Sequence, residues 1–379
     1  MAAAPIRRAL PSAPRAAGFA LVGAIAVLAL LVGLTSSVLL LTMSDARASS
    51  AAAARARALA AAEAGAVFQL EETRLGRGAA PLAGGFGGCT YTAAPAVPLG
   101  GGCWSITCTA VLGAERRVFE LFLAEGTDIA EQSFAAVRVQ GGGLLTALLP
   151  LVGDWRIAGQ DTVPPSLSGK GFDDLSEVGN GPRGALAEPA LVVHDASQRL
   201  ILATQLTLLN RAKVDGIDGS GAYATGAAAI TVDPGEAIDL RRVTAELRKG
   251  AIVVSATTAR TQFGSWAQPE VVFLEDGARL GDLSGVGVLV VTGDDLSLGG
   301  DLRWEGVVIH YSQNPIDLSL AVGGKVRIFG AQVVQDPNEL LLVESALDAH
   351  FLYSSQAVAK AVRRIATARL AVVGSRVRL

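Results

Sequence analysis

The residues that could do acid–base or metal chemistry are few and scattered. His194, His310 and His350 lie far apart, and none belongs to a His-Glu-x-x-His arrangement. His194 precedes Asp195, a pair that could exchange a proton, but a turn at a strand end is the simpler interpretation. His310 ends an apolar strand and is expected to be half-buried with its hydrogen bonds satisfied. We therefore expect no catalytic centre and a protein that is not an enzyme.

The glycine-rich segments also fall short of known ligand-binding loops. Segment 169–171 lacks the spacing and the Ser/Thr of a phosphate loop, and segment 285–287 lacks the third glycine of the dinucleotide pattern. Segment 215–219 offers two aspartates, whereas calcium takes six to eight oxygens and usually a closing glutamate. The aspartate pairs at 173–174 and 294–295 are typical of turn caps. No cofactor and no metal ion are expected.

Three cysteines lie close together in the sequence. Cys103 and Cys108 are five residues apart on one expected strand, so they face opposite sides about 16 Å apart, too far for a disulfide. A bridge would use Cys89, preferably with Cys103, because Cys108 falls on the apolar face and can stay a buried thiol. The alternative is three free thiols. Without a nearby histidine they make a poor zinc site.

Composition points to a membrane. The chain has 379 residues, a net charge of −3 and 50% hydrophobic residues, so a basic nucleic-acid binder is not expected. Residues 16–44 contain no charged side chain. As a helix, these 29 residues would be about 43 Å long, more than the ~30 Å hydrocarbon core of a membrane. Arg7, Arg8 and Arg15 precede this run, which places the N-terminus in the cytoplasm and the rest outside.

Three interpretations of the N-terminus compete: a secretory signal peptide, an uncleaved signal anchor, and a longer helix. A signal peptide has an apolar core of only about 7–15 residues, so this run is too long. From Ala46 to Leu75 the chain is rich in alanine, the best helix former. One helix is therefore expected from Phe19 to Arg74, half in lipid and half in water. Its predicted packed face comprises Leu59, Ala62, Ala66, Val67 and Leu70, and Gly76, Gly78 and Pro81 end it.

This pattern resembles the type IV pilin and pseudopilin superfamily, and within it the PilX-type pilus-assembly family and the large minor pseudopilins of type II secretion. The residues that carry the resemblance are Gly18-Phe19-Ala20-Leu21-Val22 and Ala61-Ala62-Glu63-Ala64-Gly65. It implies a leader, 1–18, cut by prepilin peptidase between Gly18 and Phe19. It also implies other pilins, pilus-assembly proteins and inner-membrane lipid as partners, in a pilus or a secretion system.

The chain departs from the major pilins at one position. They carry glutamate at the fifth mature residue, where this chain has Gly23. A carboxylate inside the membrane is costly unless it is paired, and in the superfamily it pairs with the amine of a neighbouring subunit. Its absence favours a minor or tip-located subunit. The alternative is that Gly23 is one small residue in an ordinary lipid-facing helix whose leader is never cut.

Beyond the helix, 19–77, glycine punctuates short apolar runs that are typical of strands. Region 78–145 is expected to be antiparallel and pilin-like, with strands at 104–110 and 117–123 joined by a turn near 112–115. Region 146–345 is expected to be β-rich, because Val288, Val307 and Val326 recur every 19 residues, as in a parallel β-solenoid. Segments 287–300, 304–309 and 328–334 again resemble the PilX-type family.

Region 346–379 returns to a helix, Ser354–Arg369, with Lys360, Arg363 and Arg364 on its solvated side, followed by a strand, Leu370–Leu379. The sequence thus predicts an α+β protein with a single membrane pass at the inner membrane and a periplasmic or pilus-displayed β-rich body. A second interpretation is an uncleaved, membrane-anchored β-solenoid adhesin or glycan-binding protein.

Overall fold

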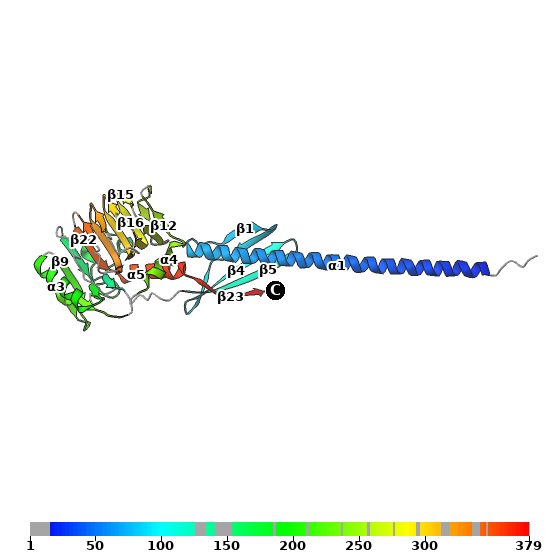
Figure 1. Ribbon diagram of the computed structural model, residues 1–379, viewed down its shortest axis with the longest axis horizontal. Coiled ribbons are helices and arrows are strands. Elements are labelled where there is room, and N and C mark those ends of the chain that lie inside the picture. The colour runs from blue at the N-terminus through cyan, green and yellow to red at the C-terminus, as the bar shows by residue number, and fades with distance from the viewer. Residues whose placement is uncertain are drawn as a thin grey trace, which may run out of the picture.

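A computed structural model describes most of the chain. The described residues are 16–125, 134–140, 154–184, 187–209, 212–235, 238–255, 258–275, 277–292, 296–311, 319–335, 342–345 and 348–378. One long helix leads into a small sheet and then into a larger β-rich body, from which the C-terminal strand returns to the small sheet (Figure 1). The fold is therefore α+β, with a long N-terminal apolar helix and a β-rich body.

The N-terminal helix α1 (Ala16–Arg74) runs without a break for 59 residues, about 88 Å at the usual rise. Its end at Arg74 confirms the predicted end. Gly76 follows with φ +78°, a left-handed conformation that glycine adopts at little cost and that stops a helix. The chain then turns into the small sheet.

The small sheet packs against the second half of α1. Its strands are β1 (Leu82–Phe86), β2 (Cys89–Ala93), β3 (Val97–Gly100), β4 (Cys103–Leu112), β5 (Glu115–Ala124) and β23 (Ala371–Arg378), in the order β1-β2-β4-β5-β23 with β3 on β4. The predicted hairpin is confirmed, because β4 and β5 pair antiparallel around Gly113, which has φ +60°. The predicted C-terminal strand is also present, and it forms an edge of this sheet.

The body contains two sheets whose strands run parallel, apart from the antiparallel pair β9–β10 in the larger one. The larger sheet holds β6 (Val137–Gln140), β7 (Asp154–Ala158), β8 (Leu191–Val193), β9 (Ala212–Ile217), β10 (Tyr223–Thr225), β11 (Ile230–Val232), β12 (Ile252–Val254), β13 (Gln262–Phe263), β14 (Glu270–Leu274), β16 (Leu283–Val291), β18 (Leu302–His310), β20 (Val326–Gln335) and β22 (Asp348–Tyr353). The second holds β15 (Arg279–Leu280), β17 (Leu296–Leu298), β19 (Ser319–Val322) and β21 (Leu342–Ser345). From β15 to β22 the chain alternates between the two ladders.

Stacked glycines set the register of the larger ladder. Gly287, Gly306 and Gly330 pair with one another across β16, β18 and β20, with φ between +129° and +147°. A Cβ on Gly330 would lie 1.8 Å from the Gly306 carbonyl oxygen, so only glycine fits there. Val288 pairs with Val307 as the 19-residue spacing predicted, but Val307 pairs with Ala331. This second step is 24 residues long, so the predicted repeat of 19 is wrong there.

Short helices cover the ladders: α2 (Pro165–Ser168), η2 (Leu175–Glu177), α3 (Ala196–Leu209), η3 (Gly226–Ala229), α4 (Leu240–Arg248) and α5 (Ser355–Ala368). The predicted C-terminal helix is α5, a short element of 14 residues capped by the Ser354 hydroxyl. One part of that prediction is wrong, because Arg364 is buried rather than solvated. Its guanidinium donates to the carbonyl oxygen of Arg74, which joins α5 to the end of α1.

The sheets cross the predicted segment boundaries in two places. β6 lies in the segment 78–145 yet pairs with β20 and β8 in the larger sheet. β23 lies in the segment 346–379 yet pairs with β5 in the small sheet. The boundaries themselves stay predictions, and the two crossings tie the small sheet and the body together.

Candidate membrane anchor and assembly surface

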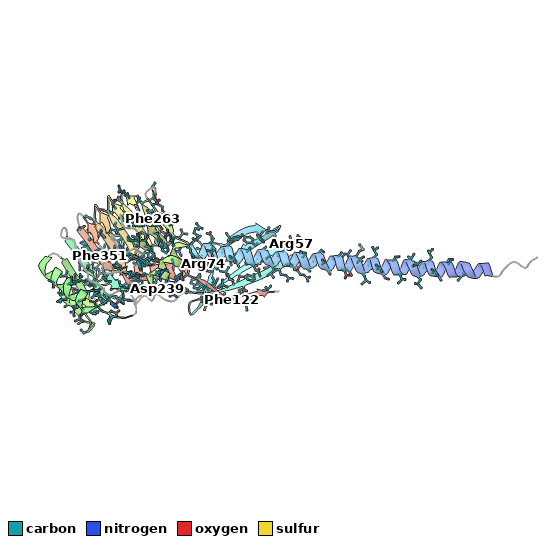
Figure 2. All side chains as sticks on the ribbon, in the orientation of Figure 1. Arg57, Arg74, Phe122, Asp239, Phe263 and Phe351 are labelled. Atoms are coloured by element: carbon teal, nitrogen blue, oxygen red, sulfur yellow. The ribbon has the colours of Figure 1, made fainter. Side chains whose placement is uncertain are left out.

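The first half of α1 carries an apolar surface with no protein packed on it. Apolar residues from Val22 to Met43 are 49–68% exposed, and they surround the helix on all sides. This is a helix long and apolar enough to cross a membrane. In Figure 2, Arg57 marks the place where α1 leaves the small sheet, and the helix beyond it projects alone. Such a surface is costly in water and favourable in lipid.

The second half of α1 is built from small residues because the sheet comes close to it. Ala61, Ala62 and Ala66 are fully buried against the inner face of the small sheet, while Glu63 is exposed. A Cβ on Gly65 would lie 2.5 Å from the Tyr91 ring and 2.6 Å from the Cys108 sulfur. The Ala-Ala-Glu-Ala-Gly stretch is therefore a packing motif. The prediction that Val67 lies on this packed face is wrong, because Val67 is 48% exposed.

Polar contacts fix the ends of this packed half. Arg55 donates to Glu115, the first residue of β5, at 3.2 Å. The buried Gln69 side chain donates to the carbonyl oxygens of Gly78 and Ala80, which holds the chain where it leaves the helix. Where α5 meets the end of α1, burial lowers the pKa of Arg364 to about 10. The guanidinium therefore occupies a poorly solvated position between α1 and α5.

The predicted cleavage position lies near the start of α1. Both Gly18 and Phe19 are helical residues, and their side chains are outside the described part of the structure. Gly23, the residue that replaces the pilin glutamate, has nothing within 4 Å of where its Cβ would be. Cleavage between Gly18 and Phe19 therefore stays a prediction.

The structure does not form the predicted disulfide between Cys89 and Cys103. All three cysteines are free. Thr90 pairs with Val111, so Cys89 lies beside the end of β4 opposite to Cys103, about nine residues or 30 Å away. Cys108 is the buried thiol that we expected, and burial raises its pKa to about 11. Register along β2 and β4 therefore excludes the bridge.

The residues considered for chemistry are not brought together. His310 is fully buried rather than half-buried, its Nε2 lies 2.8 Å from the Gln332 amide, and burial lowers its pKa to about 3. Asp195 caps α3, and His194 precedes it, as expected for a strand-end turn. Asp215 pairs with Arg156 at 2.9 Å. In the part of the chain that is described, no group of three His, Cys, Asp or Glu could hold a metal.

Sequence reasoning missed how the C-terminal strand is attached. Arg376 and Arg378 of β23 pair with the buried Glu120 of β5 at 2.6 and 2.8 Å. Arg376 also lies 5.4 Å over the ring of Phe122. Alternating arginines on a strand could have suggested one carboxylate partner. Strand β23 leaves its outer edge unpaired among the described residues, with Val372 and Val373 more than half exposed.

Comparisons with known proteins give no family. No family model matches the chain, and no curated protein matches it either. Among solved structures, the competence-associated pilin ComZ from Thermus thermophilus is similar over 86% of this chain and 98% of that one, with 12% identity and a TM-score of 0.23. A superposition that loose carries no argument, so the function is argued from this chain's own geometry.

Proposed function

We propose that this chain is a pilin-like, membrane-anchored component of pilus assembly or of a related type II secretion system. The observation that supports this most is helix α1 itself. It is one unbroken helix whose first half is apolar and bare, and whose second half packs one face, with Ala61, Ala62, Ala66 and Leu70, against a sheet. A simple anchor would need only the first half. A continuous helix fixes the body at a set distance from the membrane.

The proposed mechanism follows from this division. The bare half would hold the subunit in the inner membrane and then bury its apolar surface against the helices of other pilins on assembly. Removal of residues 1–18 would free an amine at Phe19 and delete three arginines, changing the net charge from −3 to −6. With Gly23 in place of glutamate, the chain would serve as a minor subunit. The β-rich body would be displayed rather than catalytic.

Processing tests this proposal. Gly18→Leu should leave the leader attached, because the peptidase would act next to a small residue. Gly23→Leu, the same substitution five residues later in α1, should be processed like the wild type and is the matched control. Normal processing of Gly18→Leu, or failure of both variants, would contradict the peptidase step. A processed chain should also co-purify with other pilins.

A second candidate is an uncleaved, membrane-anchored adhesin or glycan-binding protein. What favours it is the alternation of the chain between two parallel ladders from β15 to β22, the arrangement of solenoid-like rungs. Such a chain would keep Arg7 and Arg8 and would work without pilins. The same processing experiment separates the two candidates.

A further inference from the structure

Four basic residues form a row across the larger sheet. Arg303, Arg327, His350 and Arg156 pair in register on the adjacent strands β18, β20, β22 and β7. Neighbouring parallel strands lie about 4.8 Å apart, so the row spans about 14 Å. We call these four residues the basic row. Burying such charges is costly unless each has a partner.

The sheet itself supplies an acid for each arginine of the row. Arg303 pairs with Asp301 at 2.6 Å, Arg327 with Asp348 at 2.9 Å, and Arg156 with Asp215 at 2.9 Å. Lys325, just before β20, adds a further cation. Without any other group the cluster would keep one surplus positive charge, with Lys325 uncompensated.

A covering segment, 160–184, which we call the strap, brings the compensating acid. Asp173 of the strap accepts from Arg327 Nε at 3.1 Å through Oδ1, and its Oδ2 lies 3.3 Å from Lys325 Nζ. Burial acts to raise the pKa of Asp173, but Lys325 and Arg327 outweigh it, and the pKa lies below its ordinary value. Its side chain is nevertheless 54% exposed. Both oxygens of an accessible carboxylate are thus held by two cations.

The strap is attached separately from Asp173. Ser166 donates to the buried Glu305 from its backbone N–H and its hydroxyl, both at 3.0 Å. Phe172 meets Phe329 edge to face with ring centroids 5.7 Å apart. Farther along the basic row, the buried Nε of Arg156 has no hydrogen-bond partner within the described structure. The strap can therefore stay in place when the Asp173 side chain turns away from Arg327 and Lys325.

We propose that the basic row and Lys325 form a binding site for the carboxylates of an acidic polypeptide segment, which Asp173 occupies in the free protein. An acidic polypeptide is favoured over other anions because the present occupant is itself an aspartate on a polypeptide turn. The site binds a partner by exchanging one carboxylate for another. This inference goes beyond the proposed function and does not depend on leader cleavage.

The test measures binding of a fluorescent poly-glutamate peptide to the full chain in detergent, by anisotropy at low salt. Asp173→Asn should bind about tenfold more tightly than the wild type. Asp174→Asn is the matched control: it removes the same charge one residue later, where the carboxylate caps η2 by accepting from Ser176. It should bind like the wild type. The gain should disappear near 1 M salt, where charges are screened beyond about 3 Å.

Two further variants keep the proposal falsifiable. Asp173→Asn combined with Lys325→Gln should lose the gain, and Lys325→Gln alone should weaken wild-type binding. Thermal unfolding checks that every variant folds, which we expect because Arg327 keeps Asp348. An equal gain in Asp174→Asn, no gain in Asp173→Asn, or a gain retained without Lys325 would overturn the proposal. Equal competition by inorganic phosphate would overturn the choice of polypeptide carboxylates.

Discussion

Gly65 gives the sharpest test of how α1 meets the sheet. In an exposed helix, replacing glycine by alanine stabilises the protein by about 1 kcal/mol. Here the new methyl group would lie 2.5 Å from Tyr91 and 2.6 Å from Cys108, inside van der Waals contact. Overpacking of this kind costs about 1–3 kcal/mol. Gly65→Ala should therefore destabilise the fold by a net ~1 kcal/mol, about 2–4 °C in Tm for a domain of 150–250 residues.

The assay is thermal unfolding of the full chain in detergent, followed by circular dichroism. Gly33→Ala is the matched control, because nothing lies within 4 Å of where that Cβ would be. It should leave the melting temperature unchanged or raise it. In a Cys108→Ala background, Gly65→Ala should cost less, since the sulfur is gone. A Gly65→Ala protein as stable as the Gly33→Ala protein would refute the close packing of helix and sheet.

Three further predictions concern other parts of the chain. Burial lowers the pKa of His310 in the folded chain to about 3 from an ordinary value of 6.5, so between these pH values the unfolded chain binds one more proton than the folded chain. The free energy of unfolding should therefore fall by about 1.4 kcal/mol per pH unit below about pH 6.5. His310→Gln should flatten this slope in denaturant titrations, whereas an unchanged slope would contradict the burial. Alkylation without reductant should label the exposed Cys103 in the folded chain and reach Cys89 and Cys108 only after unfolding; a peptide linking Cys89 to Cys103 by mass spectrometry would disprove the register. Removing β23 should leave the β5 edge unpaired and Glu120 without its arginines, so light scattering should report aggregation that removal of Leu379 alone does not cause; a monodisperse truncated chain would count against this.

The helix was predictable because its signals are local. Charge-free residues, alanine content and the glycines after Arg74 act within a few turns, so the sequence predicted the end of α1 at Arg74. The hairpin of β4 and β5 was predictable for the same reason, since alternation and Gly113 lie side by side. The exposure of Val67 was not predictable, because which residues of the helix are buried depends on where the sheet packs against it.

Long-range pairings decided the rest. Valine spacing placed Val326 in the wrong register, whereas alignment on Gly287, Gly306 and Gly330 gives the observed one, because only glycine fits where the backbones meet. That alignment would also have placed Arg303 beside Arg327 and revealed part of the basic row. Helical spacing placed Arg364 on the solvated side of α5, but its side chain is buried because the end of α1 packs against it. No local pattern carries that contact.

The N-terminus of the native protein decides between a processed pilin-like subunit and an uncleaved anchor. Membrane-extracted chain would be examined by intact mass and terminal sequencing. A processed pilin-like chain should begin at Phe19, without Arg7, Arg8 and Arg15. A chain that begins at Met1 or Ala2 would contradict the pilin-like role and leave α1 as an uncleaved anchor for a displayed β-rich body.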